Sequence, residues 1–131
     1  MITVPVYRRF SDLDPLGHVN NVAYHDYLQE ARVGLIGDLD GVVGPGFAQI
    51  VVEQEIKHRR PLGHSREPVR IEIWISAMAR TSYTINYRIL DDDGQLAAEA
   101  TSKLTVVDPE LGRPIRIPED LLARLAPHVA Q

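Results

Sequence analysis

The sequence contains no cysteine. This absence excludes disulfide bonds, thiolate metal sites and a cysteine nucleophile, and it fits the reducing cytoplasm. No segment approaches the roughly 20 consecutive apolar residues that a membrane-spanning helix needs. The N-terminal stretch MITVPVYRRF reaches two arginines too early for a signal peptide. The net charge is −4, so no global positive field attracts nucleic acid or an anionic membrane. We therefore expect a cytoplasmic protein that binds neither nucleic acid nor membrane.

What the sequence does contain is typical of an ordinary globular protein. It has 131 residues, of which 44% are hydrophobic and 24% are charged. A chain of this length and composition suits one domain with a real core and argues against disorder. We expect residues 1–131 to form a single domain.

One long helix is predicted near the N-terminus. A strand over 2–10 and a turn rich in Asp, Pro and Gly precede it, and Asn20 or Asn21 can cap it. Gly34 is expected to permit close packing and Gly37 to end the helix, before a loop over 40–46. An apolar stripe at helical spacing predicts the buried side, and Val22 and Val33 widen it, which predicts burial on most sides. The stripe consists of Tyr24, Tyr27, Leu28, Ala31 and Leu35.

Four long strands are predicted after this helix, over 47–60, 69–79, 81–89 and 95–108, and a short helix over 117–126. Alternation predicts one buried face with Ile71, Ile73, Ile75 and Ala77, and another with Tyr83, Ile85, Tyr87 and Ile89. The DDDG sequence at 91–94 predicts a hairpin turn. One long helix and consecutive antiparallel strands indicate an α+β domain, in which the sheet must wrap the helix.

The stretch FSDLDPLGHVNNVAYHDYLQEAR, residues 10–32, carries the most distinctive pattern. It combines an aromatic-x-Asp-x-Asp turn, a glycine, His-Val-Asn-Asn, a tyrosine-containing helix and Glu-Ala-Arg. In this it resembles the hotdog-fold acyl-CoA thioesterases, in particular the 4-hydroxybenzoyl-CoA thioesterase-like branch. The resemblance implies a five-stranded antiparallel sheet wrapped around one long central helix, with a short C-terminal helix. It also implies hydrolysis of an acyl-CoA thioester to a free acid and CoA.

The same resemblance assigns catalytic roles. It makes Asp14 the nucleophile or the general base, and it makes the backbone N–H of Asn21 the group that polarises the thioester carbonyl. Both roles suit the chemistry, because thioester hydrolysis develops charge on the carbonyl oxygen and a helix start offers unpaired N–H groups. Gly17 fits a loop that a thioester approaches closely. His18 is either a catalytic polar group or a loop side chain that orders the turn, and Asp12 is expected to be structural.

Substrate-binding residues are expected around this motif. Arg59 and Arg60, beside Lys57 and Arg66, can meet the phosphates of CoA, and Arg80 matches a position where the family contacts the nucleotide. Ser82 matches a position where some hotdog thioesterases carry a polar residue that assists the reaction. Tyr24 lines an acyl pocket or simply packs in the core. Taken singly, each arginine is best interpreted as a solvated surface charge, and only as a group near one site do they indicate phosphate binding. A single hotdog domain exposes a sheet edge, so we expect a homodimer or homotetramer.

Other chemistries compete with hydrolysis. Hotdog hydratases and dehydratases use a histidine with an acid, and His18 keeps that possibility open. A non-catalytic acyl-CoA-binding module is a third possibility, since a fold does not fix a function. The GHSRE sequence at 63–67 lacks the last glycine of a nucleophile elbow, and the histidines have no zinc-binding spacing. The three aspartates at 91–93 form a solvated hairpin tip or a cation site. We expect no cofactor and no metal.

Overall fold

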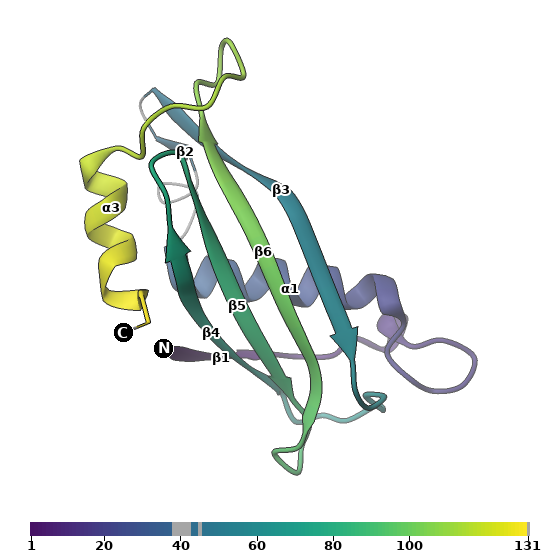
Figure 1. Ribbon diagram of the computed structural model, residues 1–131. Coiled ribbons are helices and arrows are strands. Elements are labelled where there is room, and N and C mark those ends of the chain that lie inside the picture. The colour runs from purple at the N-terminus through teal and green to yellow at the C-terminus, as the bar shows by residue number, and fades with distance from the viewer. Residues whose placement is uncertain (38–42, 45, 131) are drawn as a thin grey trace.

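The computed structural model describes residues 1–37, 43–44 and 46–130 of the chain, and its centre is one antiparallel sheet in the order β1-β4-β5-β6-β3-β2 (Figure 1). The first strand and the four long strands that the sequence predicts are all present, and β2 adds two residues at one edge. The strands are β1 (Ile2–Val6), β2 (Val43–Gly44), β3 (Phe47–His58), β4 (Val69–Met78), β5 (Ser82–Leu90) and β6 (Leu96–Val107). The fold is therefore the expected α+β hotdog fold. Of the expected loop over 40–46, only 43, 44 and 46 lie inside the described residues, and the first two form β2.

Helix α1 (Asn21–Ile36) passes behind the strands and across their direction (Figure 1). Its predicted stripe from Tyr24 to Leu35 is buried against the sheet, and Gly37 ends it with φ of 97°. The prediction of burial on most sides is wrong. Val22 and Val33 are 75% and 44% exposed, because the helix face turned away from the sheet has no covering layer among the described residues.

Residues at every second position of β4 and β5 form the core beneath this helix. Ile71, Ile73 and Ile75 are fully buried, as are Ile85 and Ile89, which alternate with the buried tyrosines of β5. Ala77 departs from the prediction and is exposed. The pairing of β4 with β5 shifts between Ile75 and Ala77, so a β-bulge moves the following side chains to the opposite face.

The first strand is an edge strand and ends at Val6 instead of continuing to residue 10. Pro5 is tolerated there because an edge strand has one side without ladder hydrogen bonds. The chain then turns through a short 3-10 helix at Phe10–Asp12. Gly34 of α1 packs against β1, since an added Cβ would lie 2.7 Å from Cγ2 of Val4. The expectation of close packing at Gly34 is confirmed.

A short helix, α3 (Glu119–Leu125), closes the fold and continues into a 3-10 turn at Ala126–His128. Leu121 and Leu125 anchor it in the core. Both chain ends flank β4, since Ile2 pairs with Ile73 and the N–H of Ala130 donates to the carbonyl of Ile75. None of the helices in the described part of the chain is long and apolar enough to cross a membrane.

Candidate active site

Asp14 heads a tight turn in front of α1. Its Oδ1 accepts hydrogen bonds from the backbone N–H groups of Leu16 at 2.9 Å and His18 at 3.2 Å. The N–H of Asp14 donates to the carbonyl of His18 at 2.8 Å, and that of Gly17 donates to the carbonyl of Asp14 at 2.9 Å. Gly17 has φ of 77°, which favours glycine because it has no Cβ. The turn therefore holds the carboxylate in one place while leaving it half-exposed.

Asp12 has a different environment, although it is only two residues away. It is 3% exposed, and its carboxylate accepts hydrogen bonds from the Tyr27 hydroxyl at 2.6 Å and the Arg9 backbone N–H at 2.9 Å. Burial by itself raises the pKa of Asp12, but the hydrogen bonds from Tyr27 and Arg9 outweigh it and leave the pKa below its ordinary value. The predicted structural role of Asp12 is confirmed, and this carboxylate ties the turn to α1.

The start of α1 presents a free donor next to this turn. Asn20 is the cap, because its Oδ1 accepts the N–H of Ala23 at 2.9 Å. Among the described residues no acceptor bonds to the backbone N–H of Asn21, the first residue of the helix. Such an N–H carries the positive end of the helix dipole and can polarise an oxygen placed against it.

A pocket of about 260 Å³ brings most of the predicted residues together. One side is the Asp14 turn with the helix start, and the other is the end of β3 with the segment that follows it. The lining residues are Asp14, His18, Val19, Asn21, Tyr24, His58, Arg59, Arg60 and Pro61. The arrangement places a carboxylate, a free backbone donor and two arginines around one opening.

Tyr24 and His58 lie side by side in the lining of this pocket. Tyr24 is buried, and burial raises the pKa of its hydroxyl. The ring of His58 stands edge-on to the ring of Tyr24, with centroids 4.6 Å apart. Sequence reasoning did not single out His58. It is the last residue of β3 and follows Gln54 and Ile56 at alternating positions, and this alternation could have placed it on the inward face.

Arg80 and Ser82 lie elsewhere in the chain. Arg80 lines a separate cavity of about 440 Å³ with Arg116. Ser82 pairs with Thr105 of β6, whereas the N–H groups of Arg59 and Arg60 donate to Ala97 near the other end of that strand. The eight-residue separation along β6 corresponds to roughly 26 Å. A single chain therefore does not bring these two residues to the Asp14 pocket.

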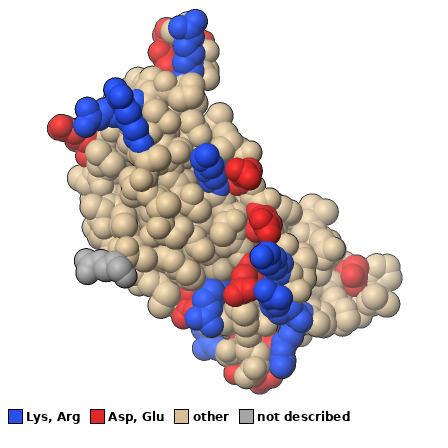
Figure 2. Space-filling model, viewed as in Figure 1, with Lys and Arg blue, Asp and Glu red and all other residues tan. Residues whose placement is uncertain are grey.

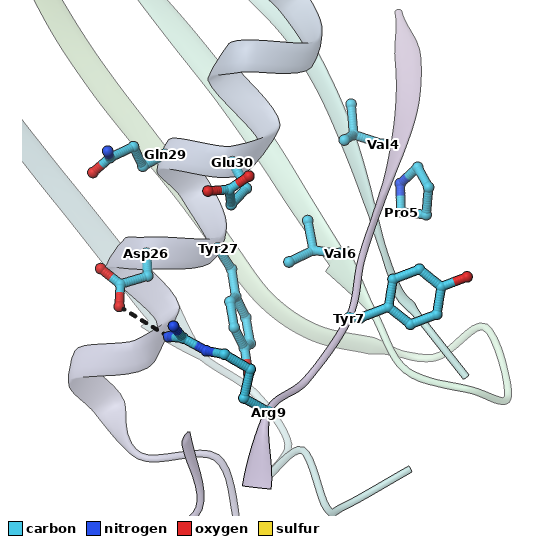
Figure 3. Close-up of a pocket in the computed structure, with 9 residues that line it drawn as sticks. All are labelled: Val4, Pro5, Val6, Tyr7, Arg9, Asp26, Tyr27, Gln29 and Glu30. Atoms are coloured by element: carbon cyan, nitrogen blue, oxygen red, sulfur yellow. Dashed lines mark ion pairs between the residues drawn. The ribbon is translucent and has the colours of Figure 1, made fainter. Parts of the chain in front are cut away.

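A larger cavity of about 540 Å³ lies between β1 and the outer face of α1 (Figure 3). At one end Arg9 forms an ion pair with Asp26 at 3.5 Å, and Val4, Pro5 and Tyr7 line the strand side. None of the predicted catalytic residues lines it. In the described part of the chain, no group of three or more His, Asp or Glu side chains is arranged to hold a metal ion.

The sheet face turned away from α1 carries intermingled charges (Figure 2). Arg88 of β5 pairs with Glu72 of β4 at 3.5 Å, and Arg59, the residue after β3, pairs with Glu99 of β6 at 2.8 Å. In Figure 2 acidic and basic side chains lie beside one another, mainly toward the lower end of the view, and the middle of this face is largely uncharged.

Comparison with known proteins agrees with this architecture. "Putative acyl-CoA thioesterase YneP" of Bacillus subtilis (strain 168) is 29% identical over 112 residues, covering 82% of this chain and 80% of YneP. The crystal structure of a thioesterase from Thermus thermophilus, complexed with coenzyme A and Zn, is 30% identical with a TM-score of 0.80, covering 95% of this chain and 92% of that one. The DHNA-CoA thioesterase of Staphylococcus aureus, at 18% identity, has the same fold with a TM-score of 0.82, covering 95% of this chain and 88% of that one. The family described as "Thioesterase-like superfamily" matches residues 8–125. The chain belongs to the thioesterase-like superfamily and is a thioester hydrolase.

Proposed function

We propose that this protein hydrolyses acyl-CoA thioesters, with Asp14 as the catalytic carboxylate. The observation that carries the proposal is the shared pocket of Asp14 and the Asn21 backbone N–H. The names of the similar proteins, one an acyl-CoA thioesterase and one a thioesterase bound to coenzyme A, support CoA as the carrier.

The roles follow from the charges that hydrolysis creates. The thioester oxygen gains negative charge as a new C–O bond forms, and the Asn21 N–H at the helix start is placed to stabilise it. Asp14 either attacks the carbonyl or removes a proton from the attacking water. The C–S bond then breaks, and CoA leaves as a thiolate that takes up a proton. If Asp14 was the nucleophile, an acyl–Asp14 anhydride is left, and water hydrolyses it to the free acid and the restored carboxylate. If Asp14 activated water, the free acid forms directly. His18 lines the same pocket and either assists this protonation or only orders the turn.

We also propose that two chains pair along β3. Beyond Ala48 no described strand covers the outer side of β3, and three consecutive apolar residues are exposed there. Ile50, Val51 and Val52 are 47%, 43% and 49% exposed. A long apolar edge left open promotes pairing with another chain, and a twofold dimer or a tetramer built from it covers this edge.

Such pairing bears on the two distant substrate residues. In an antiparallel pair of β3 strands, the His58 end of one chain lies at the Phe47 end of the other. The second chain's Arg80 and Ser82 belong to that end of its sheet. This supports the proposal that they complete the CoA site together with Arg59 and Arg60.

Location in the cytoplasm stays a prediction from the sequence.

The decisive experiment for hydrolysis uses Asp14→Asn. An asparagine Oδ1 can still accept the N–H groups of Leu16 and His18, so the turn is retained while the carboxylate is lost. We expect CoA release from a panel of aliphatic and aromatic acyl-CoAs to fall by about 10²- to 10⁴-fold. Asp26→Asn, which neutralises an exposed carboxylate outside this pocket, is the control and should keep wild-type rates.

Two outcomes would contradict the assignment. Full activity of Asp14→Asn would remove Asp14 from the mechanism. Addition of water to an enoyl-CoA without any thiol release would favour a hydratase acting through His18.

Pairing along β3 is checked separately with Val51→Lys, which should convert the assembly to a single chain in sedimentation equilibrium. An unchanged mass would refute the pairing edge.

A further inference from the structure

Two sequence features have no role in the chemistry above: the GHSRE segment at 63–67 and the aspartates at 91–93. The structure brings them together at the end of β1. Asp91 caps the hairpin itself, because its Oδ1 accepts the N–H groups of Asp93 and Gln95 at 2.9 Å. Asp92 instead points to the buried guanidinium of Arg8, at 2.5 Å.

Arg8 connects this hairpin to the GHSRE segment. Its side chain is only 2% exposed and donates to the carbonyl of Gly63 at 3.0 Å and the carbonyl of Glu67 at 2.8 Å. Within the same segment, the Ser65 hydroxyl oxygen accepts the backbone N–H of Glu67 at 3.1 Å. Arg8, paired with an aspartate 84 residues away, therefore holds this five-residue segment at both of its ends.

The other side of this segment holds the Asp14 turn. Gly63 forms an antiparallel bridge with His18, and the N–H of Val19 donates to the carbonyl of Leu62 at 2.7 Å. His18 in turn donates its backbone N–H to the carboxylate of Asp14. An unbroken series of contacts thus leads from Asp92 through Arg8 and Gly63 to His18 and the proposed catalytic carboxylate.

We propose that the Arg8–Asp92 ion pair is a positioning element of the active site, which fixes the Asp14 carboxylate by holding the 63–67 segment behind its turn. Neither residue lines the Asp14 pocket. The inference rests on the proposed function, because its effect is on the geometry of Asp14. Small displacements of a reacting group lower the rate of the chemical step more than they lower substrate binding.

The test compares Asp92→Asn and Arg8→Gln with the wild type. Asp92 is 40% exposed, so its amide variant is expected to fold. We expect kcat for acyl-CoA hydrolysis to fall about tenfold in both variants while KM stays within about twofold. Arg8→Lys should recover part of kcat, because one ammonium keeps the charge but cannot span both carbonyls. Asp93→Asn at an exposed neighbour and Arg113→Gln at an exposed position away from the site make the same charge changes and should leave kcat unchanged.

Amide hydrogen exchange gives a readout that does not depend on activity. The Val19 N–H, held by Leu62, should exchange faster in both variants, whereas the Asn20 N–H, held by the Asp12 carbonyl, should keep its wild-type rate. An active wild type with unchanged kcat and unchanged Val19 exchange in the variants overturns the positioning role alone. A wild type that hydrolyses no acyl-CoA overturns the proposed function and the catalytic consequence together.

Discussion

Replacing Tyr27 with phenylalanine removes one oxygen atom from the core. The buried carboxylate of Asp12 then loses one of its hydrogen-bond donors. The hydroxyl donates to Oδ2 of Asp12 at 2.6 Å, and both residues are buried. Hydrogen bonds to charged groups contribute about 1.5–3 kcal/mol to stability, so Tyr27→Phe should lower the free energy of unfolding by about 2 kcal/mol. For 131 residues this corresponds to a melting temperature lower by about 7 °C at fixed protein concentration.

The free energy of unfolding that Tyr27→Phe removes should depend on pH in a defined direction. The pKa of Asp12 lies below its ordinary value in the folded protein, so its ionised form stabilises the fold above about pH 4 and this contribution disappears as the pH falls through the folded pKa. The difference between wild type and Tyr27→Phe should therefore be constant from about pH 5 to 8 and shrink below about pH 4.

Urea unfolding at a series of pH values measures this difference. Tyr87→Phe is the matched control, because that buried hydroxyl donates to Ser102 at 2.8 Å and contacts no carboxylate. The change in unfolding free energy caused by Tyr87→Phe should not vary over the same pH range. Equal unfolding free energies for Tyr27→Phe and the wild type at pH 7, or a loss that persists unchanged in acid, would refute the role given to the Tyr27–Asp12 bond.

Two further predictions concern packing and substrate binding. Gly34→Ala should destabilise the fold by about 1–3 kcal/mol in thermal unfolding, because its Cβ would meet Val4 at 2.7 Å. Gly63→Ala, with nothing within 4 Å, is the comparison, and equal losses would contradict the packing explanation. Arg60→Gln should raise KM for acyl-CoA about three- to tenfold with kcat unchanged, and the effect should shrink at high salt. Arg124→Gln on α3 should change neither constant, and a similar rise there would indicate a nonspecific charge effect.

The parts of the fold that sequence reasoning predicted depend on local periodicity. The Tyr24–Leu35 stripe, the Asn20 cap and the Gly37 end each follow from residues within a few positions of one another. The errors arise where a local pattern has no information about its neighbours. Val22 and Val33 are apolar but exposed, because helical spacing does not say whether a second layer exists. Ala77 changes face because of a bulge that alternation cannot foresee.

The candidate site also contains residues that a local motif predicts and residues that only tertiary contacts bring in. Asp14, His18 and Asn21 lie within eight residues, so one local motif is enough to single them out. His58 lines the pocket only because β3 ends beside the helix start, and that is a tertiary contact. The partnership of Arg8 with Asp92 joins segments 84 residues apart, and no spacing rule predicts it. Long-range pairing of charges was therefore the part of the site that local patterns could not predict.

The position of Pro5 has a consequence for how far this sheet can grow. Proline supplies no N–H to a further strand, and β1 is only five residues long, whereas β3 has twelve. Two chains joined along β3 would present β1 at both outer edges of the combined sheet. Each of those edges is a poor template for another chain, so in a dimer of this kind strand addition would stop at two copies and would not continue into a fibre.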